Sequence, residues 1–350
     1  MRRLLKPTAG LTCLFALATA GCSAESDVDT SDAAAAAPTT PTQSTAPPGA
    51  SPSEAAASTT AYAPYVSATD ASGNDSAGSP TTYNLAFVIS DGSGCTPRWN
   101  GTDAIGDSAV KSRIARLAQD DATVRVSFGG ASGEELAASC DSASELAAAY
   151  GKALDAAGST QADFDIEGDE LADSGSVDLR SKAIAALQQE RPDLEVSFTL
   201  PVMPSGFNAD SLALLKSADE HDAQVSTVNL MTMNYGESYD GDMGTYALSA
   251  AKAAHAQLKK VFGLSDAGAW RGMALTSMIG VNDVAGETFT LLDAAQVRTF
   301  AEEKEVAWVS MWSTLRDRQC EGAAAASDDA AADCSGVTQG SGAFATTFAG

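Results

Sequence analysis

Three acidic residues alternate with apolar residues in one short stretch of the chain. Asp163, Asp165 and Glu167 are separated by Phe164 and Ile166. Successive side chains of a β-strand point to opposite faces, so the three acids would share one face and the two apolar residues the other. Ionised carboxyl groups this close repel one another, and burial adds to the effect, so we expect the group to keep a proton near neutral pH. Cleavage of a glycosidic bond needs such a protonated acid.

Eight β-rich runs alternate with amphipathic stretches between residue 62 and the C-terminus. Most of the runs are continuously apolar, which is typical of parallel strands covered by helices. Eight such strands in about 290 residues predict a (β/α)₈ TIM barrel, an α/β fold, as a single catalytic domain over residues 62–350. An open doubly wound sheet is the alternative, but the glycine-rich phosphate turn that it usually carries after its first strand is missing.

The expected strands are Tyr62–Val66, Tyr83–Ile89, Val124–Phe128, Ala162–Ile166, Leu194–Leu200, Ser226–Met233, Gly272–Ile279 and Val306–Met311. The expected helices are Ser108–Asp120, Glu134–Ala157, Val177–Glu190, Ala209–Asp219, Tyr246–Phe262 and Leu292–Lys304. The acidic run falls on the fourth strand, where its acids would point into the barrel. Glu167 comes last and lies nearest the C-terminal mouth, where barrel enzymes keep their active sites. We therefore expect Glu167 to be the acid catalyst.

The run Asp163–Glu167 resembles the strand-four signature of glycoside hydrolase family 18, the chitinases. Other segments are similar to that family in the same order along the chain, and the likeness extends over nearly all of residues 62–350. It is strongest to the compact bacterial chitinases. These segments are Val126–Gly130, Ser197–Pro201, Met231–Gly236, Met278–Asp283 and Ser310–Ser313.

The resemblance implies a role for each acid. Glu167 would protonate the glycosidic oxygen. Asp165 would orient and support the acetamido group of the substrate, and Asp163 would hold Asp165 and share its proton. The implied activity is retaining, substrate-assisted endo-hydrolysis of β-1,4 links in chitin and chito-oligosaccharides. An endo-β-N-acetylglucosaminidase that acts on N-glycans and a non-catalytic chitin-binding barrel are the alternatives.

Three further residues receive roles from the resemblance. Tyr235 would donate a hydrogen bond to the acetamido group, Trp312 would form the floor of the subsite for the reacting sugar, and Met233 would line the same pocket. Elsewhere, Trp99 is a candidate outer sugar platform, whereas Trp270 and Trp308 are expected to pack in the core. The sequence departs from the family at Thr160-Gln161, where Asp-Gly is usual, and at Gly236, where many members have Asp.

Composition limits the possible partners. The formal net charge of −25 argues against nucleic acid, because phosphate binding depends on an excess of Lys and Arg. The chain has two histidines and no C-x-x-C pair, so we expect neither a metal nor another cofactor. A serine hydrolase is disfavoured because the G-x-S-x-G elbow is missing. We expect a monomer that binds chitin or chito-oligosaccharides.

The N-terminus has the features of an export signal. Three basic residues precede a short apolar run, and residues 1–21 end just before Cys22, which resembles the acylated cysteine of a bacterial lipoprotein. Residues 22–61 are rich in Ala, Ser, Thr and Pro and are expected to form a disordered tether. We therefore expect an exported lipoprotein at the outer face of the cell membrane, which touches the membrane only through its lipid.

Four of the six cysteines lie in the expected catalytic domain. An even number of cysteines in an exported chain indicates disulfides, and four cysteines allow three pairings. We favour Cys95 with Cys140 and Cys320 with Cys334, because the second pair closes a short terminal loop.

Overall fold

The computed structural model describes residues 60–322 and 329–350, which belong to one compact unit. The predicted signal peptide (1–21), Cys22 and nearly all of the predicted tether lie outside the described residues. Within the described part of the chain, none of the helices has the length and apolar content needed to span a bilayer.

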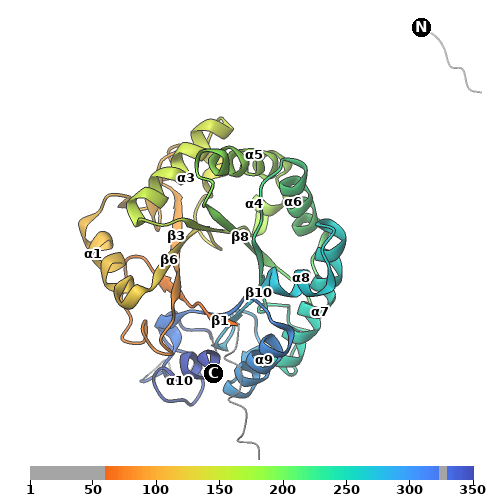
Figure 1. The fold of residues 1–350 in the computed structure, drawn as a ribbon. Coiled ribbons are helices and arrows are strands. Elements are labelled where there is room, and N and C mark those ends of the chain that lie inside the picture. The colour runs from red at the N-terminus through yellow and green to blue at the C-terminus, as the bar shows by residue number, and fades with distance from the viewer. Residues whose placement is uncertain (1–59, 323–328) are drawn as a thin grey trace, which may run out of the picture. The chain divides into compact units, whose positions relative to one another are not determined.

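Parallel strands close into a barrel, and the first strand completes it (Figure 1). The segment β1 (Ala61–Tyr62) pairs with the last strand β13 (Trp308–Trp312), whereas β2 (Tyr65–Ser67) pairs with β3 (Thr82–Ser90). Counted as one strand interrupted at Pro64, β1 and β2 make eight strands in the ring, which confirms the (β/α)₈ prediction. The other strands of the ring are β6 (Thr123–Gly129), β7 (Gln161–Asp165), β8 (Glu195–Pro201), β9 (Thr227–Met231) and β10 (Met273–Met278).

Helices surround the strands in Figure 1. A side chain at the start of each major helix accepts hydrogen bonds from its first-turn N–H groups, which satisfies donors that the helix itself leaves free. These caps are Asp107, Ser142, Asp173, Asn208, Asp242 and Thr290. The helices that they begin are α1 (Ser108–Leu117), α3 (Ala143–Ala157), α5 (Ser174–Glu190), α6 (Ala209–Glu220), α7 (Met243–Val261) and α9 (Leu291–Lys304).

One predicted helix is divided in two. The stretch 134–157 forms α2 (Leu136–Ser139) and α3, and Cys140 between them has an extended backbone. The disulfide from Cys140 to Cys95 holds this break, and Ser142 begins the next helix. The structure also contains short elements that were not expected: α4 (Gly168–Ala172), α8 (Asp266–Arg271), α10 (Ala343–Ala349), β4 (Pro97–Trp99), β5 (Asp103–Ala104), β11 (Gly280–Val281), β12 (Thr288–Phe289) and the 3₁₀ turns Gln119–Asp121 and Thr314–Arg316.

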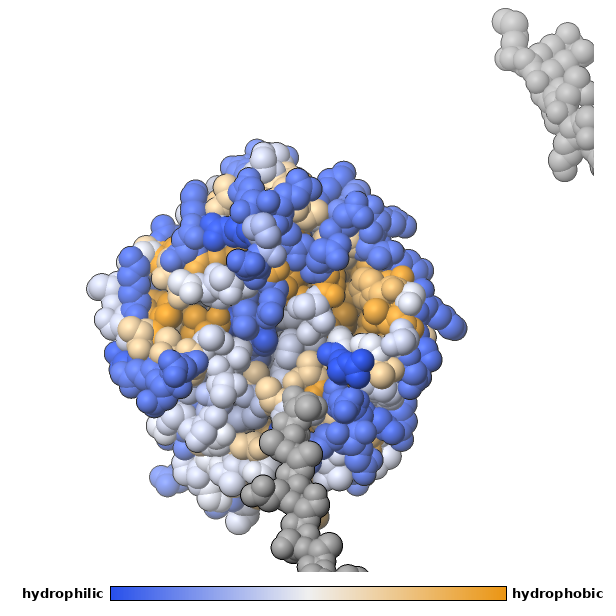
Figure 2. Space-filling view, in the orientation of Figure 1, coloured by the Kyte–Doolittle hydropathy of each residue, from blue (hydrophilic) through white to orange (hydrophobic). Residues whose placement is uncertain are grey.

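The main apolar core lies between the strands and the helices. Phe128, Phe164 and Phe198 come from three adjacent strands, and the ring centroids of successive residues are 5.2 and 5.7 Å apart. The outer surface is different: on the face seen in Figure 2, hydrophilic residues gather around the rim, over the helices. The outward side chains of the strands therefore hold the helices in place, as the apolar half of the alternating pattern predicts.

The tryptophans outside the active site are packing residues. Trp99 is 0% exposed, and its indole N–H donates to the Ile105 carbonyl at 3.3 Å, so the prediction that it forms a sugar platform is wrong. The hairpin of β4 and β5 folds back over this residue, which its position in a loop did not reveal. The Trp270 ring stacks on His255 with centroids 3.9 Å apart, and Trp308 is buried, as expected.

Both predicted disulfides are present. Cys95 bonds to Cys140, and Cys320 bonds to Cys334. The second bond lies in the C-terminal segment, which Asp317 also organises: its carboxylate accepts the backbone N–H groups of Phe344 and Ala345 at 3.0 and 2.9 Å.

Replacing both Cys320 and Cys334 with Ser should lower the free energy of unfolding by about 3 kcal/mol, because the bond closes a loop of about 15 residues. The loop length follows from the separation of 14 residues between Cys320 and Cys334. Cys95 and Cys140 are 45 residues apart, so replacing both of them with Ser should lower the free energy of unfolding by about 4 kcal/mol. Urea unfolding without reductant measures both losses. If reducing the wild-type protein leaves its midpoint unchanged, this assignment of stability is wrong.

Candidate active site

Strand β7 and the residues after it carry the three acids to one end of the barrel. Asp163 and Asp165 lie in the strand, and Glu167 is the residue at which α4 begins. The neighbouring strand β6 ends at Gly129, which has a positive φ of 95° and lies where a Cβ atom would collide with the Asp165 carbonyl oxygen. The next residue, Gly130, donates its N–H to that same oxygen at 2.8 Å. The two glycines therefore let β6 approach the acids closely, which neither a larger side chain nor a regular strand end would permit.

Asp163 is held by hydroxyl groups. It is 1% exposed, and its two carboxylate oxygens accept four hydrogen bonds from side chains of the surrounding strands. Ser127 donates at 2.7 Å and Tyr65 at 2.9 Å to one oxygen. Ser197 donates at 2.7 Å and Thr199 at 2.8 Å to the other. A carboxylate with this set of donors is stabilised in its charged form.

Asp165 and Glu167 are neighbouring carboxyl groups that both have raised pKa values. Asp165 is 5% exposed, and burial, the charge of Glu167 and the charge of Asp163 all raise the pKa of its carboxyl group well above the usual value. Burial also raises the pKa of Glu167, while its hydrogen bond with Asp165 lowers it. The expectation that Asp163 shares the proton of Asp165 stays a prediction. Hydroxyl groups donate to both oxygens of Asp163, and the charges of Glu167 and Asp163 both act on Asp165.

An aromatic and methionine-rich cavity opens above the pair. The rings of Trp312 and Phe87 stack with centroids 5.4 Å apart, and Tyr65 meets Trp312 edge-on at 5.7 Å. Two predicted site residues, Trp312 and Met233, therefore lie with the acids. The cavity is lined by Tyr65, Phe87, Ala131, Asp165, Glu167, Thr199, Met231, Met233, Asn234, Thr276, Met278, Asp283 and Trp312.

A third acid of the cavity, Asp283, was not predicted as a site residue. Its backbone N–H donates to the amide oxygen of Asn234 at 3.1 Å, and the Asn234 amide nitrogen lies 3.4 Å from its carboxylate. The charge of Asp283 contributes to the raised pKa of Glu167, after burial. A signal was present, because Asp283 ends the segment Met278–Asp283 on which the family resemblance partly rests, just beyond β10.

Tyr235 does not line the cavity. Its ring packs against Tyr239 and Tyr246, with centroids 5.7 and 6.1 Å away, and its hydroxyl is buried without a hydrogen-bond partner. Burial, followed by the charge of Glu287, raises the pKa of this hydroxyl, so it remains protonated and able to donate. Its contact with the acetamido group stays a prediction.

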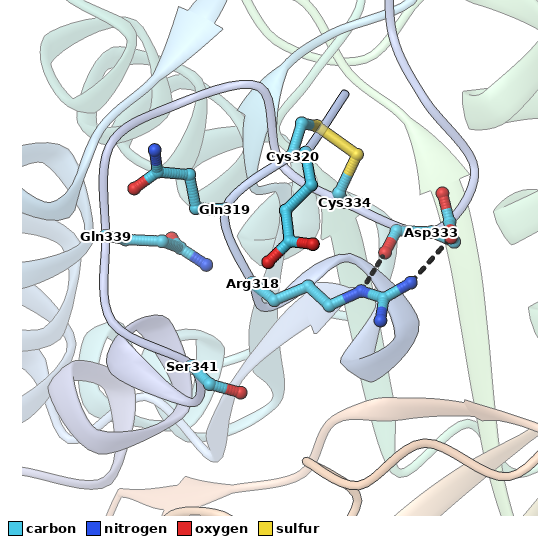
Figure 3. Close-up of a pocket in the computed structure, with 8 residues that line it drawn as sticks. Arg318, Gln319, Cys320, Asp333, Cys334, Gln339 and Ser341 are labelled. Atoms are coloured by element: carbon cyan, nitrogen blue, oxygen red, sulfur yellow. Dashed lines mark hydrogen bonds and ion pairs between the residues drawn. A yellow bond between two sulfur atoms is a disulfide. The ribbon is translucent and has the colours of Figure 1, made fainter. Parts of the chain in front are cut away.

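A separate hollow lies beside the C-terminal disulfide (Figure 3). Arg318 reaches across it and donates to the carboxylate of Asp333 at 2.6 Å, next to the bond between Cys320 and Cys334. None of the β7 acids lines this hollow, so we assign the chemistry to the barrel mouth. Within residues 60–322 and 329–350, no three His, Cys, Asp or Glu side chains are grouped to hold a metal ion.

Comparison with known proteins places this barrel among the chitinases. The chain is 35% identical over 275 residues to the "Probable bifunctional chitinase/lysozyme" of Escherichia coli, a match of 73% of the chain and 31% of that protein. It is 34% identical over 249 residues to "Endochitinase 11" of Metarhizium anisopliae, covering 67% of the chain and 47% of that protein. The chain thus matches less than half the length of these relatives. No protein-family model matches it.

The fold agrees with a solved chitinase structure. The catalytic domain of the hyperthermophilic chitinase from Pyrococcus furiosus superposes with a TM-score of 0.72 at 28% identity, covering 82% of this chain and 93% of that domain. From the sequence relatives, the matching barrel and the acids at its mouth, we conclude that the chain belongs to glycoside hydrolase family 18, the chitinase family.

Proposed function

We propose that this chain hydrolyses β-1,4 links between N-acetylglucosamine units in chitin and chito-oligosaccharides, and that it cuts within the polymer. The observation that supports this most is the pair Asp165 and Glu167, whose carboxyl groups have raised pKa values and line an aromatic cavity at the barrel mouth. The stacked rings of Phe87 and Trp312 offer an apolar surface for the carbon face of a sugar. A neutral polysaccharide is also compatible with a strongly acidic chain.

In the proposed reaction, Glu167 donates its proton to the glycosidic oxygen, and the bond from this oxygen to the sugar carbon breaks. Asp163 and Asp165 cannot serve as the nucleophile of an ordinary retaining glycosidase, since they lie on the same strand face as the acid rather than across the sugar. The acetamido oxygen of the substrate attacks the sugar carbon instead, and an oxazolinium ion forms. Asp165 stabilises this cation, and Glu167 then removes a proton from the water that opens it.

Three results should follow together if the acetamido group is the nucleophile. The first product should be the β-anomer by NMR, units without an N-acetyl group should not be cut, and a thiazoline mimic of the intermediate should inhibit. A covalent intermediate on Asp283 would also give the β-anomer, but it would not need the acetamido group. Efficient hydrolysis of fully deacetylated chitosan, or an α-anomer formed first, would therefore exclude the proposal. Release of N-glycans without cleavage of chito-oligosaccharides would favour the endo-β-N-acetylglucosaminidase alternative.

The substitution Glu167→Gln keeps the size of the side chain but removes the proton that it delivers. We expect kcat on chito-oligosaccharides to fall by roughly 10²–10⁴, while binding measured by calorimetry is retained. Asp169→Asn is a matched control, because this nearby acid is exposed on α4 and does not line the cavity. Its activity should stay within about twofold of wild type. A Glu167→Gln variant of similar activity would remove Glu167 from its role.

We also propose that Cys22 anchors the protein to the outer face of the cell membrane through an attached lipid. The support is the sequence alone: a basic start, a short apolar run and small residues directly before Cys22. The wild-type protein should sediment with membranes, and Cys22→Ser should release it or block its processing. A mature wild-type protein that mass spectrometry finds unlipidated contradicts this proposal.

A further inference from the structure

Arg125 is the only lysine or arginine in the strands that form the barrel. It lies in β6, two residues before Ser127, whose hydroxyl donates to Asp163 inside the barrel. Residues two apart in a strand share a face, so Arg125 also points into the interior, one layer below Asp163. It is 8% exposed.

The positive charge of Arg125 has no direct counterion within the described residues. Its guanidinium group donates to the side-chain oxygen of Asn84 at 2.7 Å, and its central carbon lies 4.0 Å from the centre of the Trp308 ring. Both partners are neutral, and none of the ion pairs found in the described chain includes Arg125. Burial lowers the pKa of Arg125, but the negative charge of Asp163 opposes the shift. A guanidinium group remains charged under these conditions.

Asp163 shows the complementary arrangement. Four hydroxyl groups solvate its carboxylate, but the described chain has no ion pair to it. Arg125 and Asp163 are thus an unpaired buried cation and an unpaired buried anion in neighbouring layers of one barrel. The field between them is weakly screened, since both groups are buried.

We propose that Arg125 is a positioning residue whose buried charge, one layer below Asp163, favours negative charge on the β7 acids and so sets the pH range in which Glu167 can deliver its proton. This inference rests on the proposed function of the site. With a neutral residue at position 125, negative charge at the site would be less favourable, and Asp165 and Glu167 would hold a proton to higher pH. Arg125 would act through the acids without touching the substrate.

The other ionisable groups near these residues do not replace this charge. Tyr65 from β2 and Glu195 from β8 face Arg125, and the acids Glu167 and Asp283 lie at the mouth. None of these groups carries a positive charge, so none of them replaces the cation. Removing the cation should therefore raise the pKa values of Asp165 and Glu167.

The test is Arg125→Met, which preserves an apolar stem against Trp308 and removes the charge. Carboxyl ¹³C NMR titration of the whole protein, assigned with Asp→Asn and Glu→Gln variants, should show the pKa values of the acidic group rising by about 0.5–1 unit. The limbs of the pH profile of kcat/KM on chito-oligosaccharides should move to higher pH by a similar amount. Arg125→Lys retains the charge and should reverse at least half of both shifts. If Arg125→Met does not fold, Arg125→Gln, which can still form a hydrogen bond with Asn84, should show the same rise in pKa values.

Arg113→Met is the matched control, because Arg113 is also a buried arginine, lies on α1 and pairs with Asp75 at 2.9 Å outside the barrel. It should lower the melting temperature without changing the pKa values of the acidic group. Trp308→Phe keeps the charge of Arg125 and should also leave the limbs of the pH profile of kcat/KM unchanged. If the Arg125 variants have lower activity at every pH but unchanged pKa values of the acidic group, Arg125 has only a structural role. Since the NMR titration needs no turnover, a wild-type protein inactive on chitin would overturn the proposed function separately.

Discussion

A buried carboxylate loses its water of hydration, at a cost of several kcal/mol unless other donors replace it. Asp163 recovers these donors from three strands: Tyr65 from β2, Ser127 from β6, and Ser197 with Thr199 from β8. Asp163 is in register with Ser127 on one side and with Ser197 on the other. A slip of one residue would turn these hydroxyl groups to the opposite face and leave the anion unsatisfied. The hydrogen bonds to one carboxylate thus fix the register of the strands on both sides of it.

Because side chains alternate along β7, one face of the strand packs against the helices and the other carries the acids. Phe164 packs outward in a stack with Phe128 and Phe198, while the acids on the other face rise toward the mouth. Each step outward gives an acid fewer hydrogen-bond donors. Asp163 has four hydroxyl donors, Asp165 has one oxygen without a partner, and Glu167 lines the open cavity. The two carboxyl groups with raised pKa values are consequently those nearest the cavity, where hydrogen-bond donors are fewest.

The features that depend on local period could be predicted from the sequence. Buried parallel strands appear as apolar runs, and all eight barrel strands lie where such runs occur. Features that depend on distant contacts could not. Asp283 reaches the cavity from the loop after β10, and its bond to Asn234 joins two segments that are far apart in the chain. The break at Cys140 follows from a disulfide to a loop, although the flanking residues have a helical pattern. Arg125 sits inside an apolar run, and only the closed barrel shows that its charge lies below Asp163.

The interruption of the first strand at Pro64 has a consequence for how the domain folds. Ala61 and Tyr62 are in register with Trp308 and Val309, and the segment just after Pro64 pairs with β3, so the N-terminal strand is the element that joins the two edges of the sheet. These pairings connect almost the two ends of the described chain, and contacts of such long range are slow to form. During synthesis from the N-terminus, the ring cannot close until the ribosome has released β13. Closure of the ring is therefore a late step of folding, and before that step the layer of Arg125 and Asp163 is still open to water.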